Sequence, residues 1–262
     1  QEHENLRSAV EWGIDRYPER VINLIWDLSI FLSDQLPGSE LIEWTTRALQ
    51  RFDTLGSSED LSTGQQKQTY YKGLVTLGTL NLFLGQIDTA TAIAGDVIQQ
   101  LSENNIYPVL LAAAFFVKGQ ADHFLEDPAL GETLAAGEAA LKAVADHPAS
   151  RSMLSMVLLL EAQHAAQKGN LALSERYFHE STALLDDESE VFMPWAEYGR
   201  TMMMAALNTD PGDLRPQYEK GIRALRESGS RRLADMAESE LGHWLRHEGN
   251  YDEALAIYRR ML

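Results

Sequence analysis

A ladder of small, apolar and turn residues recurs along this chain at a nearly constant spacing. In its clearest copy Gly242 is followed by Leu245, Gly249, Ala254 and Tyr258, at offsets of 3, 7, 12 and 16 residues. Similar ladders start at other small residues, and the five starting positions are Gly78, Ala121, Ala162, Ala205 and Gly242. Successive starts lie 37 to 43 residues apart. A fixed period of this length predicts an array of stacked structural units.

The residues between these positions predict helices. Apolar residues recur every three to four positions, and the chain has few alternating β-branched runs and no Asn-Gly or Asp-Gly hairpin turn. Gly, Pro and Asn fall between the periodic stretches, as at Gly85, Gly169 and Gly249. The expected helices cover about 3–17, 20–35, 39–53, 65–84, 87–103, 107–125, 129–145, 150–168, 171–185, 191–208, 213–228, 231–248 and 251–262. The sequence therefore predicts an all-α chain in which small residues let paired helices approach closely.

The ladder resembles the tetratricopeptide repeat (TPR), in which a Leu-Gly pair, a turn glycine, a small residue and aromatic residues recur at these offsets. The resemblance implies a right-handed superhelix of helical hairpins, with about 12 to 13 helices. A period near 40 residues, rather than the 34 of the simplest repeat, implies longer helices or loops. We expect a single domain over 1–262, with regular repeats over 65–262. The loop from Leu55 to Gly64 has the composition of a linker but is not expected to divide the chain.

Two further stretches carry a more specific resemblance. Residues 2–7, with Ala9, Glu11 and Trp12, are similar to the segment that follows the winged-helix module in bacterial STAND regulators, which are signal-transduction ATPases. Trp44 with Ala48 and the next residue, Leu49, matches the next recurrent feature of that family. The resemblance implies that residues 1–55 join an upstream ATPase module, that the chain is a fragment of a larger regulator, and that its repeats sense an inducer or partner.

Charge and composition bear on the kind of partner. The formal net charge is −17, which repels nucleic-acid phosphates and anionic lipids at long range. The longest apolar stretch, Val109 to Val117, is too short to span a membrane, and the N-terminus has no export-signal pattern. The absence of cysteine excludes thiol chemistry and fits a reducing compartment. We therefore expect a cytoplasmic protein that binds neither nucleic acid nor membrane.

Candidate catalytic motifs are missing from the sequence. There is no phosphate-binding Gly-rich loop, no GxSxG and no HExxH pattern, so we expect neither an enzyme nor a cofactor. His243 and His247 lie four residues apart, which places two imidazoles on one helix face at metal-binding distance. A third ligand is not evident from the spacing, and two polar groove residues are the simpler interpretation. No metal site is therefore predicted.

The TPR resemblance also implies where a ligand binds. In such repeats the first helix of each hairpin lines the concave groove, at positions one, four and five residues after the small starting residue and three before it. The positions selected in this way as ligand- or partner-binding candidates are Thr79, Phe83, Lys118, Asp122, Gln163, Gln167, Met202, His243, Arg246 and His247. The expected occupant is a protein, a peptide or a small-molecule inducer. The clamp that some family members use for a peptide carboxylate is not matched, because Thr79, Asp122, Gln163, Ala206 and His243 fill its asparagine column.

Three interpretations remain open at this point. The first is a non-catalytic sensor region that regulates an attached STAND-type ATPase and its output, in transcription or signalling. The second is a free-standing TPR adaptor for protein–protein interaction. The third is an all-helical enzyme with a metal at His243 and His247. The Met202–Met204 run is either an adaptable contact surface or, as the commoner role of such runs, core packing.

Overall fold

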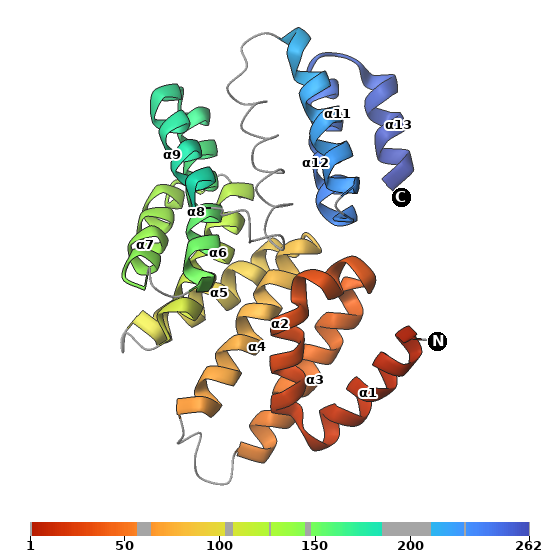
Figure 1. The fold of residues 1–262 in the computed structure, drawn as a ribbon, viewed down its shortest axis with the longest axis vertical. Coiled ribbons are helices and arrows are strands. Elements are labelled where there is room, and N and C mark those ends of the chain that lie inside the picture. The colour runs from red at the N-terminus through yellow and green to blue at the C-terminus, as the bar shows by residue number, and fades with distance from the viewer. Residues whose placement is uncertain are drawn as a thin grey trace. The chain divides into compact units, whose positions relative to one another are not determined.

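The structure is a computed structural model that describes residues 2–56, 64–102, 107–125, 127–144, 148–184, 211–227 and 229–261. Within these ranges every regular element is an α-helix, so the prediction of an all-α fold is confirmed (Figure 1). The helices are α1 (Glu2–Arg16), α2 (Pro18–Gln35), α3 (Gly38–Gly56), α4 (Gly64–Phe83), α5 (Ile87–Ser102), α6 (Pro108–Phe124), α7 (Leu130–Lys142), α8 (Pro148–Gln167), α9 (Leu171–Ala183), α11 (Pro211–Glu227), α12 (Arg231–His247) and α13 (Tyr251–Met261).

Each of these helices agrees with an expected one to within three residues at either end. The helix expected over 191–208 lies outside the described residues. None of the described helices combines the length and the apolar character needed to cross a bilayer.

The chain divides into two compact units, residues 1–144 and 145–262. The sequence predicted one domain over 1–262, and the continuity of the array from one unit to the other stays a prediction. The Leu55–Gly64 loop lies inside the first unit, where α3 and α4 on its two sides pack against each other. Each unit is described by itself below.

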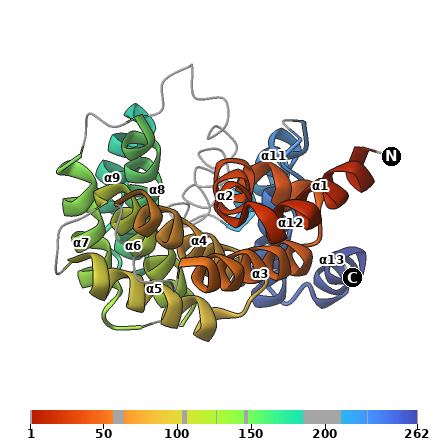
Figure 2. The ribbon, with the colours of Figure 1, turned by 90° about the horizontal axis from the view of Figure 1, so that it is seen from below.

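Helices in the first unit pack in overlapping triplets. α2, α3 and α4 contact one another pairwise, and so do α4, α5 and α6, while α7 packs on α6 and α1 packs on α2 and α3. Figure 2 shows α4 between the α2–α3 pair and the α5–α6 pair. A core cluster that includes Ile22, Ile25, Leu41, Trp44 and Leu80 fills the N-terminal triplet. The second helices α3 and α5 are thus each covered by two first helices, as in an array of stacked hairpins.

Three hairpins have the same turn. Gly85, Gly169 and Gly249 adopt left-handed φ values of 73°, 76° and 81°. In each case the next residue donates its backbone N–H to the carbonyl five residues earlier, at 2.9, 2.9 and 2.8 Å. This is the Schellman arrangement that ends a helix, and glycine suits it because it lacks a Cβ. The predicted turn glycines therefore occupy one equivalent position in three hairpins.

The small starting residues lie where paired helices approach closely. A Cβ added at Gly242 would lie 3.0 Å from two ring carbons of Tyr258, sixteen residues further on. The Ala162 carbonyl accepts a hydrogen bond of 2.7 Å from the hydroxyl of Ser174, twelve residues further on. At Gly78, an added Cβ would reach Val117 and Ile93 at 3.4 and 3.6 Å. The described ladders thus reflect helix contact, whereas the one that begins at Ala205 lies outside the described residues.

Candidate binding surfaces

Two of the predicted groove residues come from α4 and two from α6, which contact each other. Thr79 is half-buried, and its hydroxyl donates to the carbonyl of Val75 at 2.9 Å, within its own helix. Phe83 is also half-buried. The side chain of Lys118 is 22% exposed, and it forms an ion pair with Asp122. A ligand can therefore reach Thr79, Phe83 and Lys118 only in part.

Asp122 differs from the expectation that groove residues face solvent. It is completely buried, and its carboxylate accepts hydrogen bonds from Lys118 on α6 and from Thr133 on α7, the latter at 2.8 Å. A buried carboxylate needs such partners, because leaving water without them is costly. Asp122 therefore joins α6 to α7, and its sequence position one residue after Ala121 gave no sign of this role.

The second unit contains the other predicted groove residues. Gln163 on α8 is half-buried, whereas His243 and Arg246 on α12 are exposed. The Nη2 of Arg246 lies 3.5 Å from the Nδ1 of His243, and the imidazole meets the ring of Tyr258 at a centroid distance of 5.9 Å. The side chains of Gln167 and His247, and the whole of Met202, lie outside the described part of the chain. Among the described side chains, no group of three His, Asp or Glu is placed to hold a metal ion.

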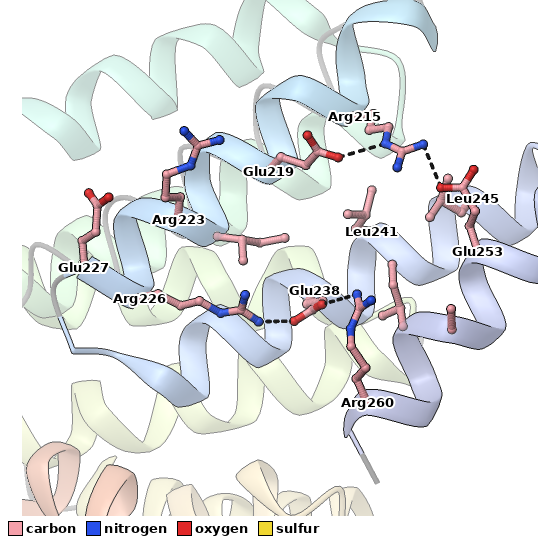
Figure 3. Close-up of a pocket in the computed structure, with 13 residues that line it drawn as sticks. Arg215, Glu219, Arg223, Arg226, Glu227, Glu238, Leu241, Leu245, Glu253 and Arg260 are labelled. Atoms are coloured by element: carbon pink, nitrogen blue, oxygen red, sulfur yellow. Dashed lines mark hydrogen bonds and ion pairs between the residues drawn. The ribbon is translucent and has the colours of Figure 1, made fainter.

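A cleft between α11, α12 and α13 was not predicted. Its volume is about 530 Å³, and α12 forms its floor between the walls made by α11 and α13 (Figure 3). Apolar side chains line the floor and lower walls, namely Ile222, Leu241, Leu245 and Ile257, all of them buried. Glutamate and arginine side chains surround them. The cleft therefore combines an apolar base with a charged rim, as small-ligand sites commonly do.

At one end of the cleft a single carboxylate holds two arginines. Glu238 on α12 accepts from Arg226 on α11 and from Arg260 on α13, the latter at 2.7 Å (Figure 3). The Glu238 side chain is 9% exposed, whereas those of Arg226 and Arg260 are 54% and 64% exposed. Since two guanidinium groups face one carboxylate, this group of three side chains carries one positive charge in excess.

At the other end of the cleft a single arginine holds two carboxylates. Arg215 on α11 donates to Glu219 at 2.9 Å and forms an ion pair with Glu253 on α13 at 2.8 Å (Figure 3). The hydrogen bond to Glu219 and the charge of Glu253 raise the pKa of the Arg215 guanidinium. This end carries one negative charge in excess.

The cleft and the predicted groove lie on opposite sides of α12. Glu238, Leu241 and Leu245 line the cleft, whereas His243 and Arg246 belong to the groove set. At about 100° of rotation per residue, the mean directions of the two sets differ by roughly 140°. Sequence reasoning missed the cleft because its charges lie on three helices. The one local signal is that a glutamate precedes an arginine by seven residues on both α11 and α13.

Two ionisable groups nearby are affected by burial. Burial raises the pKa of the Tyr218 phenol well above its usual value. Burial also raises the pKa of the Glu240 carboxyl, and the nearby His243 opposes this shift. A phenol that is harder to ionise is a poor general base or nucleophile at neutral pH.

No protein-family model matches the chain, and no match to a curated protein was found. The class that the structure itself defines is an all-α protein built of packed helical hairpins, and the TPR and STAND resemblances depend on the sequence patterns alone.

Proposed function

We propose that this chain is a non-catalytic binding region made of TPR-like hairpins, and that it senses a ligand or partner for an attached STAND-type ATPase. The observation that carries the proposal is the repeated hairpin. Gly85, Gly169 and Gly249 make the same left-handed turn, and overlapping helix triplets stack around α4. Such arrays bind ligands along an extended surface, because each hairpin contacts only its neighbours and adds one strip to that surface.

The packing of the first unit indicates which strip is available. The second helices α3 and α5 are each covered by first helices on two sides, whereas α2, α4 and α6 contact one another in sequence. The remaining face of these first helices is the natural position for a groove. In the second unit the exposed Arg246 and His243 belong to the same predicted strip. Arginine beside an aromatic ring is a composition found at binding hot spots.

The type of partner follows from the charge. With a net charge of −17, the chain favours a protein, a peptide or a small inducer over nucleic acid. The right-handed superhelix and the cytoplasmic location are parts of the same proposal. Transcription regulation or signalling would be the output of the attached modules.

The binding proposal is tested by thermal-shift screening of the full chain against metabolites and peptides. A ligand present at one hundred times its dissociation constant should stabilise the fold by about 2.7 kcal/mol. Gln163→Ala and Arg246→Ala should abolish the shift, whereas Glu175→Ala, an exposed change on the second helix α9, should leave it intact. Glu219, on the second helix α11, would not serve as such a control, because it lines the cleft. A thermal shift that depends on Glu175 but not on Gln163 or Arg246 would place the ligand-binding surface outside the proposed groove. Chemical turnover of any bound ligand would contradict a non-catalytic role.

The link to an ATPase has a separate test. The coding sequence upstream of residue 1 should encode a phosphate-binding loop and a winged-helix module. A start codon immediately before residue 1 would instead favour the free-standing adaptor.

A further inference from the structure

We propose that the α11–α13 cleft is a second binding site, which takes a short apolar peptide with a free N-terminus and a free C-terminus. The site is independent of the groove proposed above, because it lies on the opposite side of α12. The argument depends on how charge is distributed along the cleft and on the length over which it is distributed.

The two ends of the cleft have opposite polarity. Arg226 and Arg260 share one carboxylate at the first end, so their remaining N–H donors are available to a second one. Guanidinium groups hold a carboxylate through paired, charge-assisted hydrogen bonds. Glu219 and Glu253 share one arginine at the other end, which leaves carboxylate oxygens available to an ammonium group. A ligand that carries both charges fits both ends at once.

The distance between the ends is set by the two wall helices. Glu219 precedes Arg226 on α11, and Glu253 precedes Arg260 on α13, by seven residues in each case. Seven residues of α-helix rise by about 10.5 Å. An extended peptide spans about 3.3–3.6 Å per residue, so three residues bridge this distance. The ligand length that matches the charge separation is therefore about that of a tripeptide.

The remaining surface of the cleft favours an apolar ligand body. Ile222, Leu241 and Ile257 line the region between the charged ends, and Ala256 on α13 adds a small exposed side chain. Arg223 and Glu227 also line the cleft, with Glu227 directly after Arg226 on α11. Their charged groups point away from the two ion-paired groups in Figure 3, so each of those groups keeps its own excess charge. The volume of about 530 Å³ lies within the range of small-ligand sites.

The charged groups are also held before a ligand arrives. Glu238 is nearly buried on the floor, and both guanidinium groups are attached to it. Arg215 ties α11 to α13 at the other end through Glu253. Groups that are already ordered lose less side-chain entropy on binding, which favours affinity for a ligand of the right length.

The experiment is isothermal titration calorimetry of the full chain with the tripeptide Ala-Leu-Ala, its N-acetylated form and its C-terminal amide. We expect the unmodified peptide to bind, and either blocked form to bind at least tenfold more weakly. Arg260→Ala should weaken binding of the unmodified peptide at least tenfold but should change binding of the amide much less. Glu253→Gln should also weaken binding of the unmodified peptide at least tenfold, but it should change binding of the acetylated peptide much less.

Matched controls come from the adjacent positions on α13. Arg259→Ala and Asp252→Asn remove the same charges from exposed side chains that are not among those lining the cleft. Their effect on peptide binding should be less than twofold. Because Glu238 keeps Arg226 in the Arg260→Ala variant, thermal unfolding should show an intact fold. No detectable heat with peptide at about 10 mM, which would place the dissociation constant above the millimolar range, would overturn the proposal. Equal binding of the blocked forms, or equal losses in the control variants, would also overturn it. None of these results would bear on the groove, whose test uses Gln163 and Arg246.

Discussion

The contact between Gly242 and Tyr258 leads to a graded prediction about stability. An added Cβ at Gly242 would lie 3.0 Å from two ring carbons of Tyr258 and 3.2 Å from its hydroxyl oxygen. At Gly78 the nearest atoms, on Val117 and Ile93, lie at 3.4 and 3.6 Å, which is ordinary van der Waals contact. Both glycines are inside helices, where alanine is favoured by about 0.8–1.0 kcal/mol. Gly78→Ala should therefore raise the free energy of unfolding by up to about 1 kcal/mol.

Gly242→Ala should show little or none of this gain. The gain in helix propensity is the same, but the new methyl group displaces the Tyr258 ring by a few tenths of an ångström in a packed contact. The Tyr258 hydroxyl is buried without a hydrogen-bond partner among the described residues, so moving it breaks no such bond. Leucine has no room at all, and Gly242→Leu should destabilise the fold by about 1–3 kcal/mol through overpacking. We expect the same sign for Ala162→Leu and for Gly78→Leu.

Urea denaturation of the full chain, followed by circular dichroism, measures these differences. Gly78→Ala is the matched comparison for Gly242→Ala, since both substitutions add one methyl group to the first helix of a hairpin. An equal gain in both variants would mean that the Tyr258 ring yields freely and would refute the argument from close contact. An unchanged stability of Gly242→Leu would show that the repeat register itself is wrong.

Three further predictions concern a turn and two carboxylates. Gly249→Ala should lower the free energy of unfolding by about 1 kcal/mol, because the φ of 81° at this position disfavours a Cβ. Gly95→Ala should instead raise the free energy of unfolding, because Gly95 lies inside α5 with open space around it. Equal effects in urea denaturation would contradict this explanation. Asp122→Ala should lower the free energy of unfolding by about 2–3 kcal/mol, since hydrogen bonds to a buried charged group are lost. A change below about 0.5 kcal/mol would indicate that Asp122 faces solvent. Burial raises the folded-state pKa of Glu240, so this carboxyl favours the folded state at low pH and opposes it as the pH rises through that pKa. Glu240→Gln should therefore raise the free energy of unfolding at pH 7 and make it depend less on pH between pH 7 and pH 5. Glu248→Gln, at an exposed position, should do neither. Identical pH dependence of the unfolding free energy in the two variants would exclude the burial effect.

Local patterns in the sequence were sufficient to predict the helices and their turns. Helix ends depend on nearby residues, such as the left-handed glycine at Gly169 and the Asn170 side chain that accepts from Leu173 N–H at 3.3 Å. The close contacts of Gly242 were also predictable, because a small residue sixteen positions before an aromatic one also occurs at Ala162 and Phe178. Both kinds of signal lie within a single hairpin.

The candidate sites were harder to predict because they depend on contacts between helices. The position of Asp122, one residue after Ala121, predicted a groove residue. Its carboxylate instead accepts a hydrogen bond from Thr133 on the next helix. The cleft requires Arg226, Glu238 and Arg260 from three different helices. Periodicity assigns each of these residues to an exposed or buried face, but it does not say which charges meet. The alignment of α11 with α13 across α12 determines that, and it depends on the packing of all three helices.

The part of this acidic chain that forms the cleft has no net charge of its own. Residues 211–262 contain nine basic and nine acidic residues, so the formal charge of −17 comes entirely from residues 1–210. Exposed charges more than about 8–10 Å apart are largely screened at physiological salt. The orientation of a ligand therefore depends on the charged side chains of the cleft itself, which are Arg226 and Arg260 at one end and Glu219 and Glu253 at the other. It follows that added salt should weaken peptide binding in the cleft only moderately, because a peptide in contact with these groups lies well within that screening distance and carries no net charge. A ligand attracted by the overall charge of the chain would instead have to be cationic and would lose most of its affinity in salt, so the salt dependence separates local recognition from general attraction.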